Sequence, residues 1–217
     1  MIVLGIDGAL GAFSVSLASN GAVVASDSKD GAVALEAGLA MVADILARAE
    51  FAPPAIDRIA VGCGPGTFTG LRIAVAYAKS LAQAWRRPLV AIDSFDVLEY
   101  GRNFERVLTV IVGRPGVISA RYRNAARIRR ASGRIAEVVA AVLENGATAL
   151  PIVGARKDVL AALAERGTVV QPFDPLVRPA AAAVALAAFE RTPASSIHEV
   201  RADYGELPAA RSPKLAK

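Results

Sequence analysis

The residues whose types and spacing could do chemistry are concentrated in one glycine-rich segment, residues 62–72, with the sequence GCGPGTFTGLR. Residues 59–61 before it form an apolar run that predicts a buried strand, and the apolar residues 73–85 after it predict a helix. A strand, a glycine-rich turn and a helix N-terminus can together bind an anion through backbone N–H groups. The same pattern also fits a tight strand-to-helix connection that binds nothing, so both interpretations stay open here.

Two familiar phosphate-binding loops do not match this segment. A Walker A loop needs a lysine next to its last glycine, and none of these glycines is followed by Lys. The dinucleotide-binding sequence needs a third glycine where Thr67 stands. Thr67 or Thr69 could cap the predicted helix, and Gly70 would allow a close approach to its first turn.

Residues 64–72 instead resemble, without a gap, the sequence G-P-G-[ST]-F-T-G-[LI]-R that is typical of the bacterial TsaB (YeaZ) family. The resemblance implies an α/β fold of the actin-like ATPase and sugar kinase type, with two small α/β lobes. It implies a non-catalytic dimerisation or scaffold subunit that needs no cofactor. Such a subunit binds and activates TsaD, which makes threonylcarbamoyladenosine in tRNAs that read codons beginning with A. The ATPase TsaE joins the larger complex, and a homodimer is a further option.

The N-terminal residues test this resemblance. Residues 2–7, 12–18 and 22–26, separated by turns, predict a β-meander, with which actin-like folds begin. The family usually reads D-T-S at the first turn, whereas this chain keeps Asp7 but has Gly8 and Ala9 in place of the hydroxyl residues that would face a phosphate. We therefore expect Asp7 to cap a turn or end a strand. The residues that we expect to shape the helix start or an interlobe ligand cleft are Asp7, Gly64, Pro65, Gly66, Thr67, Phe68, Thr69, Gly70 and Arg72.

Two predicted helices, residues 35–50 and 71–86, are apolar on more than one face. The first has its main apolar stripe on Leu35, Leu39, Val42 and Leu46, with Met41 and alanines on the other side. Such helices either lie between a sheet and a second lobe or offer a spare face to a partner, and the resemblance favours a partner, although the histidine that usually starts the first helix is missing. The expected partner-interface residues are Leu35, Leu39, Ala40, Ala43, Ala47, Ile73, Tyr77, Ser80 and Ala84.

The net charge of +5 comes largely from one arginine-rich segment, residues 121–134, that has no acidic residue. Residues 117–123 and 127–131 predict a hairpin, which would set Arg121, Arg123, Arg127 and Arg129 in a row on one sheet face. A solvated face is the simpler interpretation. If tRNA contacts the chain, indirectly or weakly, we expect it at these four residues.

Bulk properties indicate a cytoplasmic accessory protein. Hydrophobic residues make up 54% of the 217 residues, yet charges interrupt every apolar run before it reaches membrane-spanning length, and no signal peptide is expected. The later sequence alternates predicted strands and helices, as α/β folds do. We expect one lobe over residues 1–98 and a second over 99–217, with the final helix and tail returning to the first.

The sequence offers little for catalysis. The single cysteine, Cys63, and the single histidine, His198, lie far apart in the chain, so no metal site and no catalytic set of side chains is expected. The alternative function is a stand-alone actin-like nucleotide-binding enzyme, such as a small kinase or ATPase, favoured by Asp7 and the glycine-rich loop. A peptidase, once suggested by the grouping of relatives with glycoproteases, lacks the residues for it.

Overall fold

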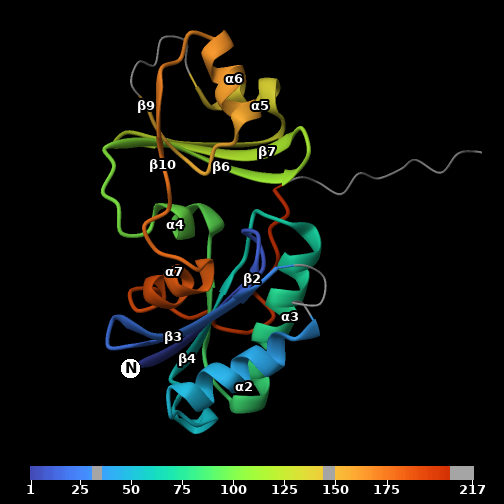
Figure 1. Ribbon diagram of the computed structural model, residues 1–217, viewed down its shortest axis with the longest axis vertical. Coiled ribbons are helices and arrows are strands. Elements are labelled where there is room, and N and C mark those ends of the chain that lie inside the picture. The colour runs from blue at the N-terminus through green and yellow to red at the C-terminus, as the bar shows by residue number, and fades with distance from the viewer. Residues whose placement is uncertain (31–35, 144–149, 206–217) are drawn as a thin grey trace, which may run out of the picture.

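The computed structural model describes residues 1–30, 36–143 and 150–205, which are built around two five-stranded sheets (Figure 1). The first sheet has the order β3-β2-β1-β4-β5, and the second has the order β10-β9-β6-β7-β8. The strands of the first sheet are β1 (Ile2–Asp7), β2 (Phe13–Ser19), β3 (Ala22–Lys29), β4 (Arg58–Gly62) and β5 (Leu89–Ile92). The strands of the second are β6 (Arg106–Arg114), β7 (Val117–Asn124), β8 (Ile128–Arg134), β9 (Leu150–Val153) and β10 (Val170–Phe173).

Each sheet combines an antiparallel meander with parallel strands. In the first sheet β1, β2 and β3 are antiparallel, while β4 and β5 run parallel to β1. Asn20 and Gly21 connect β2 to β3 with φ angles of +53° and +81°, as a two-residue hairpin turn of the favoured hand requires. The predicted N-terminal β-meander is therefore confirmed.

Helices cover both faces of the first sheet. On one face lie α2 (Gly38–Arg48) and α3 (Phe68–Trp85), whose buried side chains share a core with Leu4 and Ile6 of β1. On the other face lies α7 (Ala180–Ala187), whose residues pack against Val3, Ala60 and Val90 (Figure 1). The short 3-10 helix η1 (Pro53–Ala55) precedes β4.

The second sheet carries α5 (Ile135–Val142) and α6 (Lys157–Glu165), which pack on its outer face as Figure 1 shows. Helix α4 (Ser94–Glu99) lies between the two sheets, in contact with α7 and β6. The segment after α7 runs back along the first sheet, where the Ala194 N–H donates to the Leu89 carbonyl oxygen at 2.9 Å and the Asp203 N–H donates to the Cys63 carbonyl oxygen at 2.7 Å. Among the described residues, no helix has the length and apolar character to cross a membrane.

The first predicted helix needs one correction. Its buried face consists of Gly38, Met41, Val42, Ile45 and Leu46, whereas Leu39 is 50% exposed. Leu39 was expected on the apolar stripe and Met41 on the opposite side, and both expectations are wrong. The buried face is centred on Met41, Val42 and Ile45, and residue 39 lies about 60–160° away from these positions at about 100° per residue. Leu35 and the residues after 205 lie outside the described residues.

Candidate functional site

The glycine-rich loop between β4 and α3 packs against the chain's own backbone. A Cβ atom at Gly70 would collide with the Gly8 carbonyl oxygen, and one at Gly66 would collide with the Ala9 carbonyl oxygen. At Gly64, where φ is +101°, a Cβ would meet the carbonyl oxygen of Asp203. The close approach that these glycines permit is therefore made by the β1–β2 turn and by the C-terminal segment.

The side chains of this loop make contacts that the sequence did not reveal. Thr67 stands at the N-cap of α3, but its hydroxyl donates to the Gly8 carbonyl oxygen at 2.8 Å and makes no capping bond. Its N–H donates to the Ala9 carbonyl oxygen at 2.9 Å. Phe68 is 57% exposed, with the Tyr204 ring 4.9 Å from its centroid and the Arg72 guanidinium at 5.2 Å. The loop thus joins three segments and exposes an aromatic side chain at the start of α3.

Asp7 ends β1 and is completely buried. Its Oδ1 accepts hydrogen bonds from the N–H groups of Ala9 at 3.1 Å and Leu10 at 3.0 Å, which confirms the expected turn-capping role. Its Oδ2 is buried without a hydrogen-bond partner in the described part of the chain. Burial raises the pKa of the Asp7 carboxyl from its ordinary 3.8 to about 6, although the two backbone hydrogen bonds act in the opposite direction.

A cleft of about 920 Å³ opens between the two sheets. Of the expected cleft residues it includes Thr67, whereas Asp7, Gly64, Pro65, Gly66, Phe68, Thr69, Gly70 and Arg72 do not line it. Its walls come from Val97 and Leu98 of α4, from single residues of β2, β3 and the glycine-rich loop, and from four stretches of chain (residues 9–12, 110–115, 154–156, and 174–180 without Leu176). Three arginines line it, Arg114, Arg156 and Arg178, together with one acidic residue, Asp174. A sequence signal that could have located this cleft is the glycine or proline that follows a strand, as Pro115 follows β6, Gly154 follows β9 and Pro175 follows β10.

The described residues provide little for covalent or metal chemistry. Within them, no group of three or more His, Cys, Asp and Glu side chains lies close enough to hold a metal ion. Burial raises the pKa of the Cys63 thiol to about 12, so the thiol stays protonated near neutral pH and is a poor nucleophile.

The expected partner-interface residues lie on the outer sides of α2 and α3. Leu39, Ala40, Ala43 and Ala47 of α2 are exposed, as are Ser80 and Ala84 of α3. Ile73 and Tyr77 are half-buried. The Tyr77 ring lies edge-on to Phe13 at 5.9 Å and fills the space beside Gly38, so it joins the two helices to each other and to the sheet. We call this outer surface the α2/α3 face.

The expectation for the arginine hairpin is wrong in two respects. The turn sets Arg123 opposite Ile128 and Arg121 opposite Arg130, so Arg129 shares a face with Tyr122 rather than with Arg121. The length of the connection fixes this register, and a shift of one residue moves every side chain to the other face. Arg127 lies in the turn, where its N–H donates to Asn124 Oδ1 at 2.9 Å. The four arginines therefore do not form one row.

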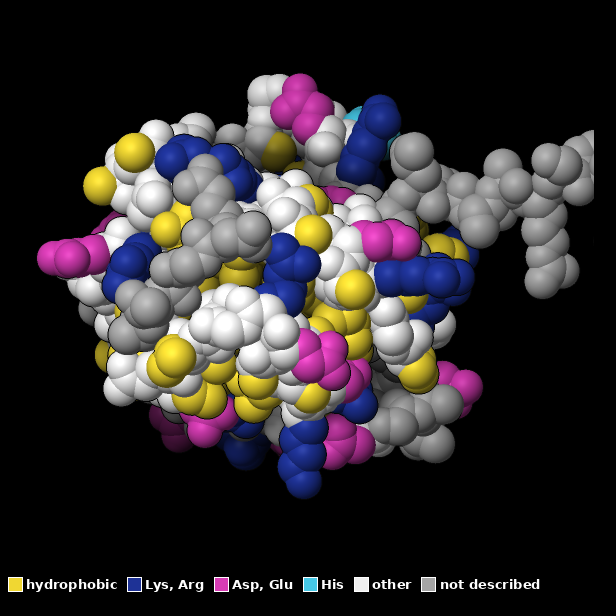
Figure 2. All heavy atoms as spheres, turned by 90° about the horizontal axis from the view of Figure 1, so that it is seen from above, with side chains coloured by type: hydrophobic (Ala, Val, Ile, Leu, Met, Phe, Trp, Pro, Cys, Tyr) yellow, Lys and Arg dark blue, Asp and Glu magenta, His cyan; other side chains and the backbone are white. Residues whose placement is uncertain are grey.

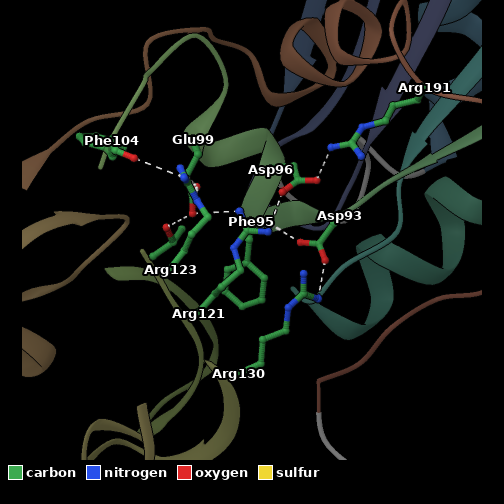
Figure 3. A network of polar contacts seen from close by, with 10 residues as sticks. Asp93, Phe95, Asp96, Glu99, Phe104, Arg121, Arg123, Arg130 and Arg191 are labelled. Carbon is green, nitrogen blue, oxygen red and sulfur yellow. Dashed lines mark hydrogen bonds and ion pairs between the residues drawn. The ribbon is translucent and has the colours of Figure 1, made fainter. Parts of the chain in front are cut away.

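The simpler interpretation, a solvated face, is also wrong for Arg121 and Arg123. Arg121 is 4% exposed and forms ion pairs with Asp96 at 2.6 Å and Glu99 at 2.9 Å, and Arg123 pairs with Glu99 at 2.8 Å (Figure 3). Burial alone would lower the pKa of Arg121, but the two carboxylates outweigh it and raise that pKa. On the face that Figure 2 shows, the Lys and Arg side chains lie apart, between acidic and apolar ones.

The two sheets, the helices on their faces and the cleft between them define an α/β protein with the actin-like ATPase and sugar kinase type of fold, as expected. The family model described as "TsaD: tRNA N6-adenosine threonylcarbamoyltransferase" matches residues 35–200, and the chain belongs to that family. Within it, the resemblance to TsaB (YeaZ) proteins is confirmed by the comparisons that follow.

The chain is 33% identical over 122 residues to the tRNA threonylcarbamoyladenosine biosynthesis protein TsaB of Escherichia coli, an alignment that covers 54% of this chain and 53% of that protein. The matched parts span 23% to 53% of the first three curated relatives. The solved structure of YeaZ from Pseudomonas aeruginosa has a TM-score of 0.70 and 25% identity, with 94% of this chain and all of that chain covered. The ethanolamine utilization protein EutJ from Carboxydothermus hydrogenoformans shares the fold with a TM-score of 0.52.

Proposed function

We propose that this chain is a non-catalytic accessory subunit in threonylcarbamoyladenosine modification of tRNA, and that it acts in the cytoplasm by binding and activating a TsaD-type transferase. Membership of the family and the names of the TsaB relatives support the pathway. The buried thiol of Cys63, which stays protonated near neutral pH, supports an accessory rather than a catalytic role.

The observation that carries the binding part of the proposal is the composition of the α2/α3 face. Its exposed residues include Leu39, which is half exposed, and alanines at 40, 43, 47 and 84, and the charges of Asp44 and Arg48 on α2 pair with each other. Small side chains allow a partner helix to approach closely, and desolvating them costs little. The position of both helices is also fixed, because their buried sides pack in the core of the first sheet. A pair of helices fixed on the core, with several small side chains on its outer side, suits a helical partner.

The test is light-scattering chromatography of the protein alone and mixed with TsaD from the same cell. We expect a 1:1 complex that Ala40→Arg and Ala84→Arg each weaken at least about tenfold, because a buried unpaired charge is costly. Ala161→Arg, at an exposed alanine of α6 on the second sheet, is the matched control and should bind normally. Absence of a complex, or a complex that survives both variants, would contradict the proposal. The same chromatography of the protein alone tests for a homodimer.

Further partners follow from the same proposal. A TsaE-type ATPase would join the complex, and tRNA would contact this chain weakly or indirectly. Arg121 and Arg123 of the expected set are engaged in ion pairs with Glu99. The two proposed lobes, residues 1–98 and 99–217, would then serve separate roles, with the α2/α3 face in the first.

The second candidate, a nucleotide-binding enzyme, has one observation in its favour. The cleft of about 920 Å³ is large enough for a nucleotide and is lined by three arginines. Gly8 and Ala9 lack the hydroxyls that would bind a phosphate, which counts against it. Calorimetric titration with ATP and magnesium separates the two candidates: tight binding with turnover would favour the enzyme.

A further inference from the structure

The arginines of β7 and β8 meet one short helix that lies between the two sheets. Arg121, Arg123 and Arg130 share one face of the second sheet, because Arg121 pairs with Arg130 across the strands and Arg123 lies two residues further on. Opposite them, α4 and the residue before it supply three carboxylates, Asp93, Asp96 and Glu99 (Figure 3). Every one of these three carboxylates forms an ion pair with the second sheet.

Each carboxylate also has two or more partners. Asp96 accepts from Arg121 at 2.6 Å through Oδ1 and from Arg191, just beyond α7, at 2.8 Å through Oδ2. Asp93 caps the Phe95 N–H at 2.7 Å and pairs with Arg130 at 2.7 Å. Glu99, 6% exposed, accepts from Thr109 of β6 besides its two arginines. The Phe95 ring lies 5.2 Å from Arg121 and 5.4 Å from Arg130. We call this set the α4 network.

A second connection joins the sheets at another point. The Asp203 N–H donates a hydrogen bond to the carbonyl oxygen of Cys63, directly after β4, as described above. Two residues later, Gly205 lies against Pro65 of the first sheet's loop and against Ser119 and Ser132 of β7 and β8. The hydroxyl of Ser132 donates to that of Ser119 at 2.8 Å. The C-terminal segment therefore contacts both sheets within three residues.

We propose that the α4 network and this C-terminal segment hold the two lobes in one fixed relative orientation, so that the cleft between them neither opens nor closes. Separating α4 from the second sheet would break all four of these ion pairs and the hydrogen bond between Thr109 and Glu99 at the same time. Val97 and Leu98 of the same helix line the cleft, so fixing α4 also fixes one wall of it. The proposal needs no partner protein and is independent of the proposed function.

The test measures the distance between the lobes in the full chain. Spin labels are attached to cysteines introduced at the exposed positions Gln83 of α3 and Ala161 of α6, in a Cys63→Ala background, and the distance distribution is read by pulsed dipolar spectroscopy. We expect one narrow distribution that millimolar ATP with magnesium does not shift. The double variant Asp96→Asn/Glu99→Gln should at least double its width. Asp44→Asn, which removes the exposed pair with Arg48 inside α2, should leave it unchanged.

A broad distribution in the unmodified chain, a shift on adding ATP with magnesium, or an unchanged width in the double variant would each overturn the proposal. If the double variant does not fold, Arg191→Gln decides, because this more exposed arginine contributes one of the two ion pairs of Asp96. It should broaden the distribution measurably, and a width equal to that of the unmodified chain would again overturn the proposal.

Discussion

At the scale of single residues, Asp7 matches the aspartate of the family's D-T-S sequence, but Gly8 and Ala9 replace the two hydroxyl residues and Asp7 caps a turn. Its carboxyl ends β1 and caps the following turn through the N–H groups of Ala9 and Leu10. With Gly8 and Ala9 beside it, and with Gly70 of α3 packed directly on Gly8, this turn supports the start of α3. Asp7 therefore contributes to the connection between the β1–β2 turn and the glycine-rich loop.

The raised pKa of Asp7 makes the stability depend on pH. The native state holds this proton up to about pH 6, whereas the unfolded chain releases it near 3.8. The stabilisation is therefore fully present below pH 3.8 and is lost as the pH rises through 6, a change of about 3 kcal/mol. Asp7→Asn, which cannot titrate, should remove this dependence. Urea unfolding of both proteins at pH 4 and pH 8 measures it; the same difference between the two proteins at both pH values would contradict the prediction.

At the scale of elements, α7 is the helix whose packing leaves least room for change. Its eight residues are six alanines, a valine and a leucine, and five of them are fully buried. The helix lies so close to β1 that a Cβ at Gly5 would collide with the carbonyl oxygen of Ala181. Because the contact is between backbones, larger side chains cannot be accommodated by a change of rotamer alone.

We expect Ala185→Leu to destabilise the protein by about 1–3 kcal/mol, since the added carbons have no space beside β1. Ala187→Leu, at a half-buried position of the same helix, is the control and should cost clearly less. The free energy of unfolding in urea compares the two variants. Equal losses would show that α7 is not held as closely as these contacts indicate.

At the scale of the whole molecule, the two sheets are joined by more than one segment. Helix α7 follows β10 of the second sheet but packs on the first, and the C-terminal segment returns along β4 and β5. The α4 network adds buried ion pairs between α4 and the second sheet. Neither sheet can lose its partner without exposing buried charge or apolar surface.

We therefore expect one cooperative unfolding transition rather than two. In differential scanning calorimetry the calorimetric and van't Hoff enthalpies should agree, as they do for a two-state transition. The transition should also coincide when followed by far-ultraviolet circular dichroism and by the fluorescence of Trp85 at the end of α3. Two resolved transitions, or probes with different midpoints, would mean that the lobes unfold separately.

Much of the architecture could be predicted from the sequence because it depends on local signals. Alternating apolar residues and the Asn20–Gly21 turn define the N-terminal meander, and the apolar residues 73–85 indicate the helix α3. The nine residues 64–72 also pointed to the family that the comparisons confirm. Strong local periodicity is retained in the folded chain because each element must bury its own apolar face.

Only the tertiary structure decided what the charged residues and the loop glycines contact. Arg121 reads as a solvated residue in a basic segment, yet Asp96 and Glu99, more than twenty residues away, bury and neutralise it. The glycines of the loop suggest a ligand, yet backbone from Gly8, Ala9 and Asp203 occupies the space beside them. The sequence states which groups are available, but electrostatic pairing and steric fit depend on distances between segments that no local pattern encodes.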